Sequence, residues 1–160
     1  MLQSGRVTSA RQDGLVVFFI GMRINRLHRP DKWIPVAMAM QRMLAELGAD
    51  PDSGFLGYET LLKGLRAPCV LQYWRDFDSL ERYAHAAERE HRPAWAEFNR
   101  KVAGNGAVGI FHETYVVRAG AYETVYANMP PFGLGKVSGV VPATGSRNAA
   151  RARMGAMTDE

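Results

Sequence analysis

The sequence predicts an α+β fold built as one domain, and three observations lead to it. One face of residues 15–25 is apolar throughout when the segment is drawn as a strand. Residues 31–47 carry apolar side chains at helical spacing. Segments of these two kinds follow one another in the order strand, helix, strand, strand, helix, strand, and 160 residues have room for one buried core between such layers.

The first long strand is expected over residues 15–25. Strand-like residues around Val7 precede it, and Asp13-Gly14 predicts a tight hairpin turn between the two. Successive side chains of a strand point to opposite faces. The apolar face holds Phe18, Ile20, Met22 and Ile24, and the other face holds Phe19, Gly21, Arg23 and Asn25.

A helix and a hairpin are expected next. Asp31 is the predicted N-cap of a helix that runs to about Leu47, with Pro35 in its first turn and Gly48 as its stop. Residues 55–63 and 68–75 are rich in strand-forming residues, and a short turn region joins them. These two strands are therefore predicted to form a hairpin.

The remaining elements complete the pattern. Asp76 or Asp78 is expected to cap a second helix, and Pro93 suits the first position of a further one. Strands are expected over residues 107–118 and 122–129. This order is the ferredoxin-like βαββαβ arrangement with an extra strand. We expect residues 1–142 to form the domain, and residues 143–160, rich in arginine and small residues, to be a disordered tail.

A four-stranded sheet with helices on one face leaves its second face uncovered. The economical way to bury that face is to pack it against the sheet of a second subunit. We therefore expect a homodimer with a cavity in each subunit, either between the sheet and its own helices or beneath the partner.

The composition argues against several classes of function. The net charge of +4 owes much to arginines in the last stretch, so no basic face for nucleic acid is expected. No apolar run is long enough to cross a membrane and residues 1–14 lack a signal peptide's apolar centre, so we expect a cytoplasmic protein. Cys69 is the only cysteine and is expected to be an inert buried thiol. Motifs for nicotinamide, ATP or zinc do not occur in the sequence.

A small reaction pocket is indicated between residues 72 and 115 by two tryptophans, Trp74 and Trp95, and by two of the three histidines there, His91 and His112. His112 lies mid-strand, which leaves two interpretations: a core histidine bonded to a backbone carbonyl, or a general base. Glu113 is expected on the opposite face. Arg23 and Asn25 either mark a strand running out to solvent or stabilise and orient an oxyanion.

Other candidates for ligand binding are mostly aromatic. They are equally typical of core packing, and the segment after Asn128 is either a flap over the cavity or a cover for a sheet edge. His91 is a helix-entry residue or a ligand-binding one. The candidate substrate-binding residues are Trp74, Trp95, Phe98, Tyr126, Asn128 and His91.

The chain resembles the dimeric α/β-barrel superfamily that includes the antibiotic-biosynthesis monooxygenases, and within it a monooxygenase-like family related to the fumagillin-pathway enzyme. The resemblance covers about residues 5–141. It is carried by VFFIGMRIN at 17–25, QYWR at 72–75, HRPAW at 91–95, GIFHETY at 109–115 and YANMP at 126–130.

The resemblance implies oxygenation of an electron-rich small molecule, aromatic or similar to a polyketide or terpenoid, without metal or flavin. In this scheme His112 is the base, Arg23 and Asn25 stabilise charge, and Trp74, Trp95 and Tyr126 form the walls.

A second resemblance, to the haem-dependent aldoxime dehydratases, implies an alternative. The position that matches their haem-ligating histidine holds Trp95, and tryptophan does not ligate iron. A haem-binding lyase or oxygenase would therefore need His91 or His112 as its axial ligand. We expect no cofactor, with haem as the alternative. A third possibility is a dimer that binds a small hydrophobic or aromatic ligand without catalysis.

Overall fold

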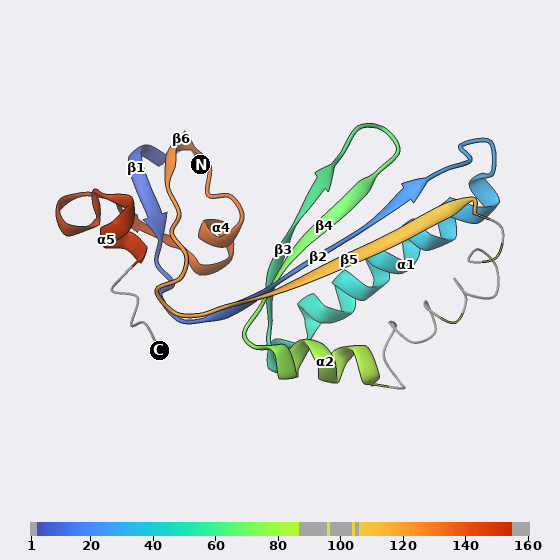
Figure 1. Ribbon diagram of the computed structural model, residues 1–160, viewed down its shortest axis with the longest axis horizontal. Helices are drawn as coiled ribbons and strands as arrows, with labels where there is room; N and C mark the ends of the chain where they lie inside the picture. The colour runs from blue at the N-terminus through green and yellow to red at the C-terminus, as the bar shows by residue number, and fades with distance from the viewer. Residues whose placement is uncertain (1–2, 87–95, 97–103, 105, 155–160) are drawn as a thin grey trace.

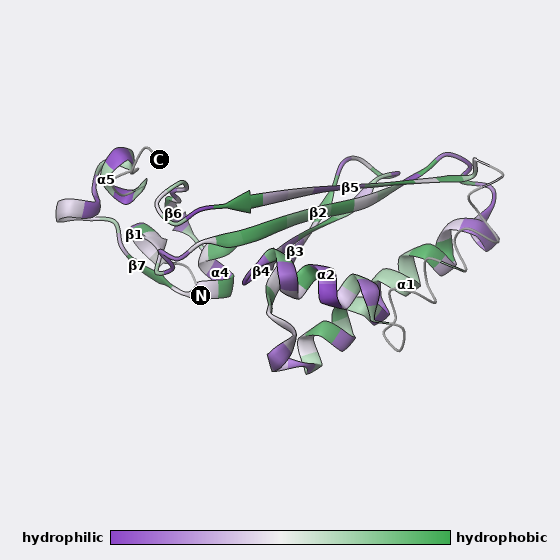
Figure 2. Ribbon diagram, turned by 60° about the horizontal axis from the view of Figure 1, so that its bottom comes forward, coloured by the Kyte–Doolittle hydropathy of each residue, from purple (hydrophilic) through white to green (hydrophobic). Residues whose placement is uncertain are grey.

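The computed structural model describes residues 3–86, 96, 104 and 106–154. Its larger sheet has four antiparallel strands, β2 (Leu15–Ile24), β3 (Phe55–Leu62), β4 (Pro68–Trp74) and β5 (Val108–Val117), in the order β3-β4-β2-β5. Two helices, α1 (Pro30–Ala49) and α2 (Phe77–His85), lie on the same side of this sheet (Figure 2). The predicted α+β class and ferredoxin-like order are confirmed.

A second, smaller sheet lies beyond one end of the first (Figure 1). It consists of β1 (Gln3–Ser9), β6 (Tyr126–Met129) and β7 (Val140–Pro142) in the order β6-β1-β7. The predicted hairpin at Asp13-Gly14 is therefore wrong, because β1 pairs with β6 and β7 and not with β2. The strand predicted over residues 122–129 is shorter than expected and belongs to this second sheet.

Residues 143–154, which were predicted to belong to a disordered tail, have a fixed place in the structure. After the short helix α4 (Leu134–Ser138) and β7 come a 3-10 turn η3 (Gly145–Arg147) and the helix α5 (Ala150–Met154). Arg153 is held by Glu123, with 2.8 Å between Nη2 and Oε2. Arg6 donates to Oδ1 of Asn148 at 2.9 Å. These long-range contacts are why an arginine-rich segment has a fixed place.

The helix α1 begins two residues earlier than an N-cap at Asp31 predicts, and it runs one residue past Gly48. Asp31 is not its N-cap. Pro30 occupies the first turn, where a missing N–H costs nothing, and no side chain caps the helix. Asp31 instead accepts hydrogen bonds from Arg29 at 2.7 and 2.8 Å, which lower the pKa of its carboxyl group.

The β3–β4 hairpin and the start of α2 agree with prediction. A 3-10 turn, η1 (Pro51–Ser53), leads from α1 into β3. Asp76, one of the two predicted caps, accepts a hydrogen bond from the backbone N–H of Ser79 at 2.7 Å. The helix predicted to begin at Pro93 lies largely outside the described residues, as do His91, Trp95 and Phe98.

Two apolar clusters fix the layers. Between the large sheet and its helices, Trp74 is fully buried against a group of neighbours from β2, α1 and α2: Val16, Leu47, Leu80 and Tyr83. On the other face of the sheet, Leu15 and Tyr73 pack against Leu134 of α4. The second cluster joins α4, which lies between β6 and β7 in the chain, to the large sheet.

Candidate functional site

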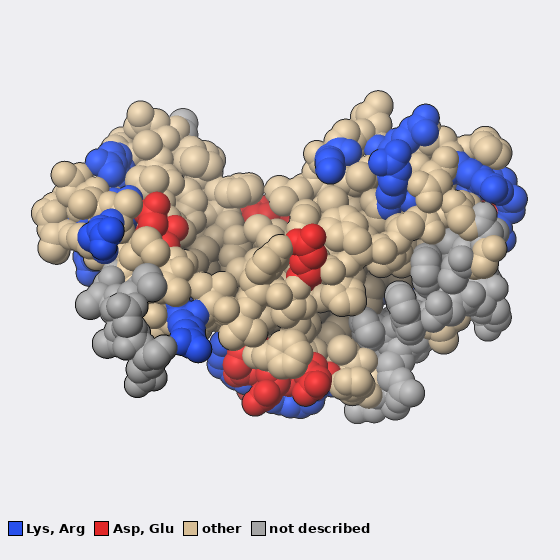
Figure 3. All heavy atoms as spheres, in the orientation of Figure 1, with Lys and Arg blue, Asp and Glu red and all other residues tan. Residues whose placement is uncertain are grey.

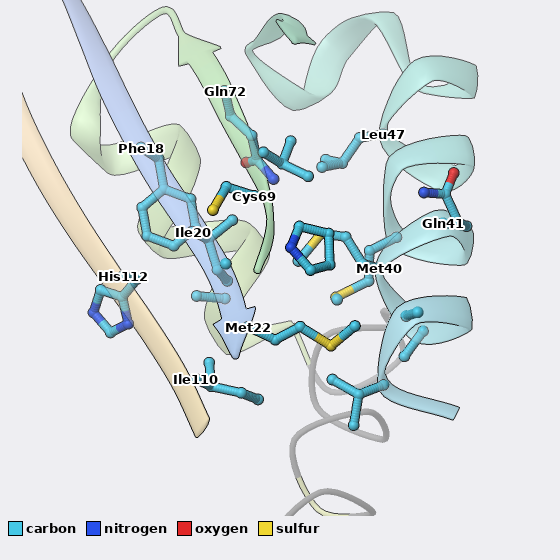
Figure 4. A pocket seen from close by; sticks show the side chains of 18 of the residues that line it. Phe18, Ile20, Met22, Met40, Gln41, Leu47, Cys69, Gln72, Ile110 and His112 are labelled. Atoms are coloured by element: carbon cyan, nitrogen blue, oxygen red, sulfur yellow. The ribbon is translucent and has the colours of Figure 1, made fainter. Parts of the chain in front are cut away.

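A cavity of about 450 Å³ lies between the large sheet and its two helices (Figure 4). Phe18, Ile20 and Met22 of β2 form its sheet side, as the period-two pattern predicted. The helix α1 supplies Val36, Met40, Met43 and Leu47, and α2 supplies Leu80, Tyr83 and Ala84. The walls are therefore largely aliphatic, aromatic and thioether groups, which suit an apolar ligand.

His112 lies on the wall of this cavity. It stands on β5 opposite Ile20, and its neighbours on the same face, Ile110 and Thr114, also line the cavity. Its imidazole ring lies 5.5 Å from the ring of Phe18, centroid to centroid. The side chain is exposed, so the interpretation as a buried core histidine is wrong, and the imidazole is accessible from the cavity.

Glu113 points to the opposite face of the sheet, as predicted. There it accepts a hydrogen bond from the hydroxyl group of Tyr115, and this bond raises the pKa of the tyrosine. Glu113 is therefore not the partner of His112.

Trp74 also lines the cavity. Its indole N–H donates to Oε1 of Gln72 at 2.9 Å. Gln72 was not singled out from the sequence, although a signal was present. It occupies an inward position between Val70 and Trp74 in a strand that is otherwise apolar on that face.

The helix α2 contributes polar groups that sequence reasoning missed. His85 is exposed but also lines the cavity, and so does Glu81. The hydroxyl group of Tyr83 donates to Glu46 of α1 at 2.9 Å and ties the two helices together. Spacing within α2 would have placed Glu81 and His85 on one face, four residues apart.

Arg23 and Asn25 are not brought together with His112. They lie at the odd-numbered positions of their segment, on the face opposite Met22, and neither lines the cavity. The side-chain amide of Asn25 donates to the carbonyl oxygen of Gly106 at 3.1 Å. Within one described chain, these two residues have no access to a ligand beside His112.

Tyr126 and Asn128 lie in the small sheet, away from this cavity. The hydroxyl oxygen of Tyr126 accepts from the N–H of Gly135 at 2.9 Å. Asn128 has a positive φ of 53° and accepts from the N–H of Gly5 at 3.2 Å. Both therefore stabilise the small sheet, and Tyr126 lines only a second hollow of about 310 Å³ between the sheets.

Cys69 is buried, as expected. Its thiol donates to the carbonyl oxygen of Ala67 at 3.3 Å, and burial raises its pKa, both of which disfavour a thiolate nucleophile. Among the residues that the structure describes, no group of three or more histidine, cysteine or acidic side chains is placed to hold a metal ion. None of the helices in that same part of the chain is both long and apolar enough to span a membrane.

The chain is 32% identical to monooxygenase af470 of Aspergillus fumigatus over 118 residues, which are 74% of this chain and 36% of that protein. The chain therefore spans about a third of the length of this relative. Two solved structures of aldoxime dehydratases share the fold, one with a TM-score of 0.67 and 22% identity over 88% of this chain and 43% of the other. The second, in complex with butyraldoxime, has a TM-score of 0.64 and 21% identity, and the match covers 80% of this chain and 38% of the other.

A family model settles the relationship at the level of sequence. The model described as monooxygenase af470-like matches residues 15–134, which run from β2 to α4 and contain every described residue that lines the cavity. The chain therefore belongs to the monooxygenase af470-like family.

Proposed function

We propose that this protein oxygenates an electron-rich small molecule in the cavity between the large sheet and its helices, with His112 as the proton acceptor and without metal or flavin. The observation that carries the proposal is an accessible imidazole on the wall of a mainly apolar cavity, in a member of a monooxygenase-like family. Because the matched relative is much longer, its activity supports the reaction type and not the substrate.

The chemistry needs no external reductant if the substrate is a carbon acid. His112 takes a proton from a CH₂ group next to an aromatic ring or carbonyl group, and the resulting carbanion gives electrons to dioxygen. A carbon–oxygen bond forms, and the imidazolium returns its proton to the peroxide. Loss of water then leaves a new carbonyl group, so one oxygen atom enters the product and the other leaves as water.

The surroundings of His112 favour this step. Phe18, Ile20 and Ile110 adjoin it on the cavity wall, so an apolar ligand that fills the cavity displaces water from this side of the imidazole and strengthens the attraction between the imidazolium and the carbanion. Arg23 and Asn25, which the resemblance implied as charge stabilisers, are not required in this scheme.

The test uses anthrone, a flat ketone with an acidic CH₂ group. We expect the protein to consume one dioxygen per anthraquinone formed, and His112→Gln to lower the rate about 100-fold or more. His85→Gln is the matched control, since it removes the other described imidazole at the cavity. Equal rates for wild type and His112→Gln, or no oxygen uptake above the background of buffer alone, would contradict the proposal. Tight binding of anthrone without turnover would favour a non-catalytic ligand-binding protein.

A haem protein is the second candidate, because His112 and His85 both offer an imidazole at the cavity. A single axial ligand of this type is sufficient to hold haem iron, which would then supply the redox or Lewis-acid chemistry. The purified protein should be titrated with haem and its absorbance spectrum recorded. A sharp Soret band that is lost in His112→Ala or His85→Ala would support this candidate, and a spectrum equal to that of free haem would reject it.

A further inference from the structure

Gln72 is the polar side chain that the proposed reaction leaves without a role. It stands on β4, opposite Phe18 of β2, and lines the cavity with only 4% of its surface exposed. Figure 4 shows its amide group reaching from β4 toward the space between β2 and α1. A buried amide is costly unless its donors and acceptor are paired.

The orientation of this amide is fixed by chemistry. The indole nitrogen of Trp74 is only a donor, so the atom of Gln72 that lies 2.9 Å from it must be the carbonyl oxygen Oε1. Trp74 itself is fully buried and held by the aromatic cluster, which makes the anchor rigid. The NH₂ group, Nε2, is thereby the atom of Gln72 left for the cavity.

Nε2 has no hydrogen-bond partner among the described residues, although it carries two N–H donors. The nearby cavity walls are mainly apolar and offer it little. We propose that the Gln72 amide is a binding group for an acceptor oxygen of the ligand, a carbonyl or an ionised hydroxyl oxygen on a flat apolar molecule. This inference rests on the proposed function and names the substrate class more closely.

The placement relative to His112 supports the assignment. β4 and β5 flank β2, and Gln72 pairs with Phe18 where His112 pairs with Ile20. Ordinary strand spacing and rise put the two backbone positions about 12 Å apart on the same face. A molecule of two or three fused rings can therefore place an oxygen at Gln72 and a CH₂ group toward His112. When the proton leaves, charge grows on that oxygen, and the hydrogen bond from Gln72 strengthens.

The experiment compares 9-fluorenone with fluorene, which has a CH₂ group in place of the carbonyl group. Both ligands are measured without dioxygen, because fluorene has a CH₂ group next to aromatic rings that the proposed reaction would oxidise to fluorenone. We expect the wild-type protein to bind fluorenone about tenfold more tightly than fluorene after correction for their solubilities. The infrared C=O stretch of bound fluorenone should lie below its frequency in hexane.

Gln72→Met keeps the length of the side chain but removes the N–H donors, so we expect the preference for fluorenone to disappear and the C=O stretch to rise. Thr60→Val is the matched control, because it removes another polar group from the same cavity and should keep the preference. An unchanged preference in Gln72→Met would overturn the inference. If that variant does not fold, a wild-type C=O frequency equal to that in hexane overturns it instead.

The two proposals fail separately. If the wild-type protein oxidises anthrone with the help of His112 but shows no preference for fluorenone, only the role of Gln72 is rejected. If the protein prefers fluorenone but does not oxidise anthrone, the proposed oxygenase activity is rejected and the proposed ligand class is supported.

Discussion

Gly54 has no side chain, and this allows the backbone before β3 to lie directly against Ser79 of α2. It has a positive φ of 81°, and a Cβ added there would overlap the side chain of Ser79. The carbonyl oxygen of Gly54 also accepts from the N–H of Arg75 at 2.8 Å, so its backbone has little room to shift. We expect Gly54→Ala to lower the free energy of unfolding by about 2 kcal/mol or more, measured by urea denaturation.

Gly48 is the matched control for this substitution. It lies in the last turn of α1, and a Cβ added there meets nothing within 4 Å. We expect Gly48→Ala to raise the free energy of unfolding by about 0.5–1 kcal/mol, because alanine loses less conformational entropy in a helix. If both substitutions changed stability by the same amount, the steric argument at Gly54 would be wrong.

At this scale the sequence predicted part of the site. Alternation in residues 15–25 placed Phe18, Ile20 and Met22 on one face, and that face lines the cavity. The same alternation already separated Arg23 from them, but it carries no information on which face the helices cover. The places of Gln72 and His85 at the cavity could not be predicted from local sequence, because they depend on tertiary contacts: the hydrogen bond with Trp74 and the packing of the helices on the sheet.

Among the elements, α2 depends on its cap. The hydroxyl group and backbone N–H of Ser79, followed by Arg75, lower the pKa of Asp76 from its ordinary value of 3.8 to about 2. Replacing Asp76 with alanine leaves the first-turn N–H of α2 unpaired. We expect Asp76→Ala to cost about 1 kcal/mol of stability at neutral pH, measured by urea denaturation.

The same group gives stability a pH dependence. Because the folded-state pKa is the lower one, the charge of Asp76 stabilises the fold fully above pH 3.8, and this contribution is lost as the pH falls through about 2. Asp76→Asn keeps an oxygen for the Ser79 N–H but does not titrate. We therefore expect the variant to lose less stability than wild type between pH 4 and 2. Identical losses would show that other carboxyl groups account for the acid sensitivity.

Local signals predicted the elements that depend on local contacts. The β3–β4 hairpin closes over a short turn, and the Asp76 cap acts within three residues, so both were visible in the sequence. The pairing of β1 was not, because its partners β6 and β7 lie more than 100 residues further along the chain. Asp13-Gly14 has the composition of a hairpin turn, but tertiary pairing overrides that preference.

For the whole molecule, Arg153 tests whether the C-terminal segment belongs to the fold. Its side chain is only 5% exposed and donates to Glu123 at 2.8 Å and to the carbonyl oxygen of Asn148 at 2.7 Å. We expect Arg153→Ala to cost about 2–3 kcal/mol, because it leaves these acceptors without their partner. The melting temperature should fall by roughly 5–10 °C. The exposed Arg151→Ala is the control and should leave it nearly unchanged. Equal melting temperatures for both variants would restore the view of a dispensable tail.

The outer face of the large sheet bears on assembly. The small sheet lies beyond one end of it (Figure 1). Further along β2 and β5, Phe19 and Phe111 pair on the face opposite α1 and α2, with ring centroids 5.2 Å apart. Phe111 is 37% exposed and Tyr115 is 52% exposed. Figure 3 shows Lys and Arg side chains at the two ends of the molecule, and between them a surface that is largely uncharged apart from Asp and Glu side chains, most of which gather at its lower edge. A sheet face with exposed aromatic side chains suits a second copy packed sheet to sheet.

We therefore predict a homodimer through this face, which Phe111→Lys should convert to a monomer in sedimentation equilibrium or light scattering. Leu65→Lys is the matched control, because Leu65 is 94% exposed in the β3–β4 turn and the same charge there should leave the dimer intact. A wild-type monomer, or a dimer that both variants keep, would contradict the prediction. The cavity with His112 and Gln72 lies on the inner face of the sheet, away from the proposed dimer interface, and one chain supplies the lining residues described here. The Phe111→Lys monomer should therefore still bind fluorenone with the wild-type preference, which separates assembly from ligand binding.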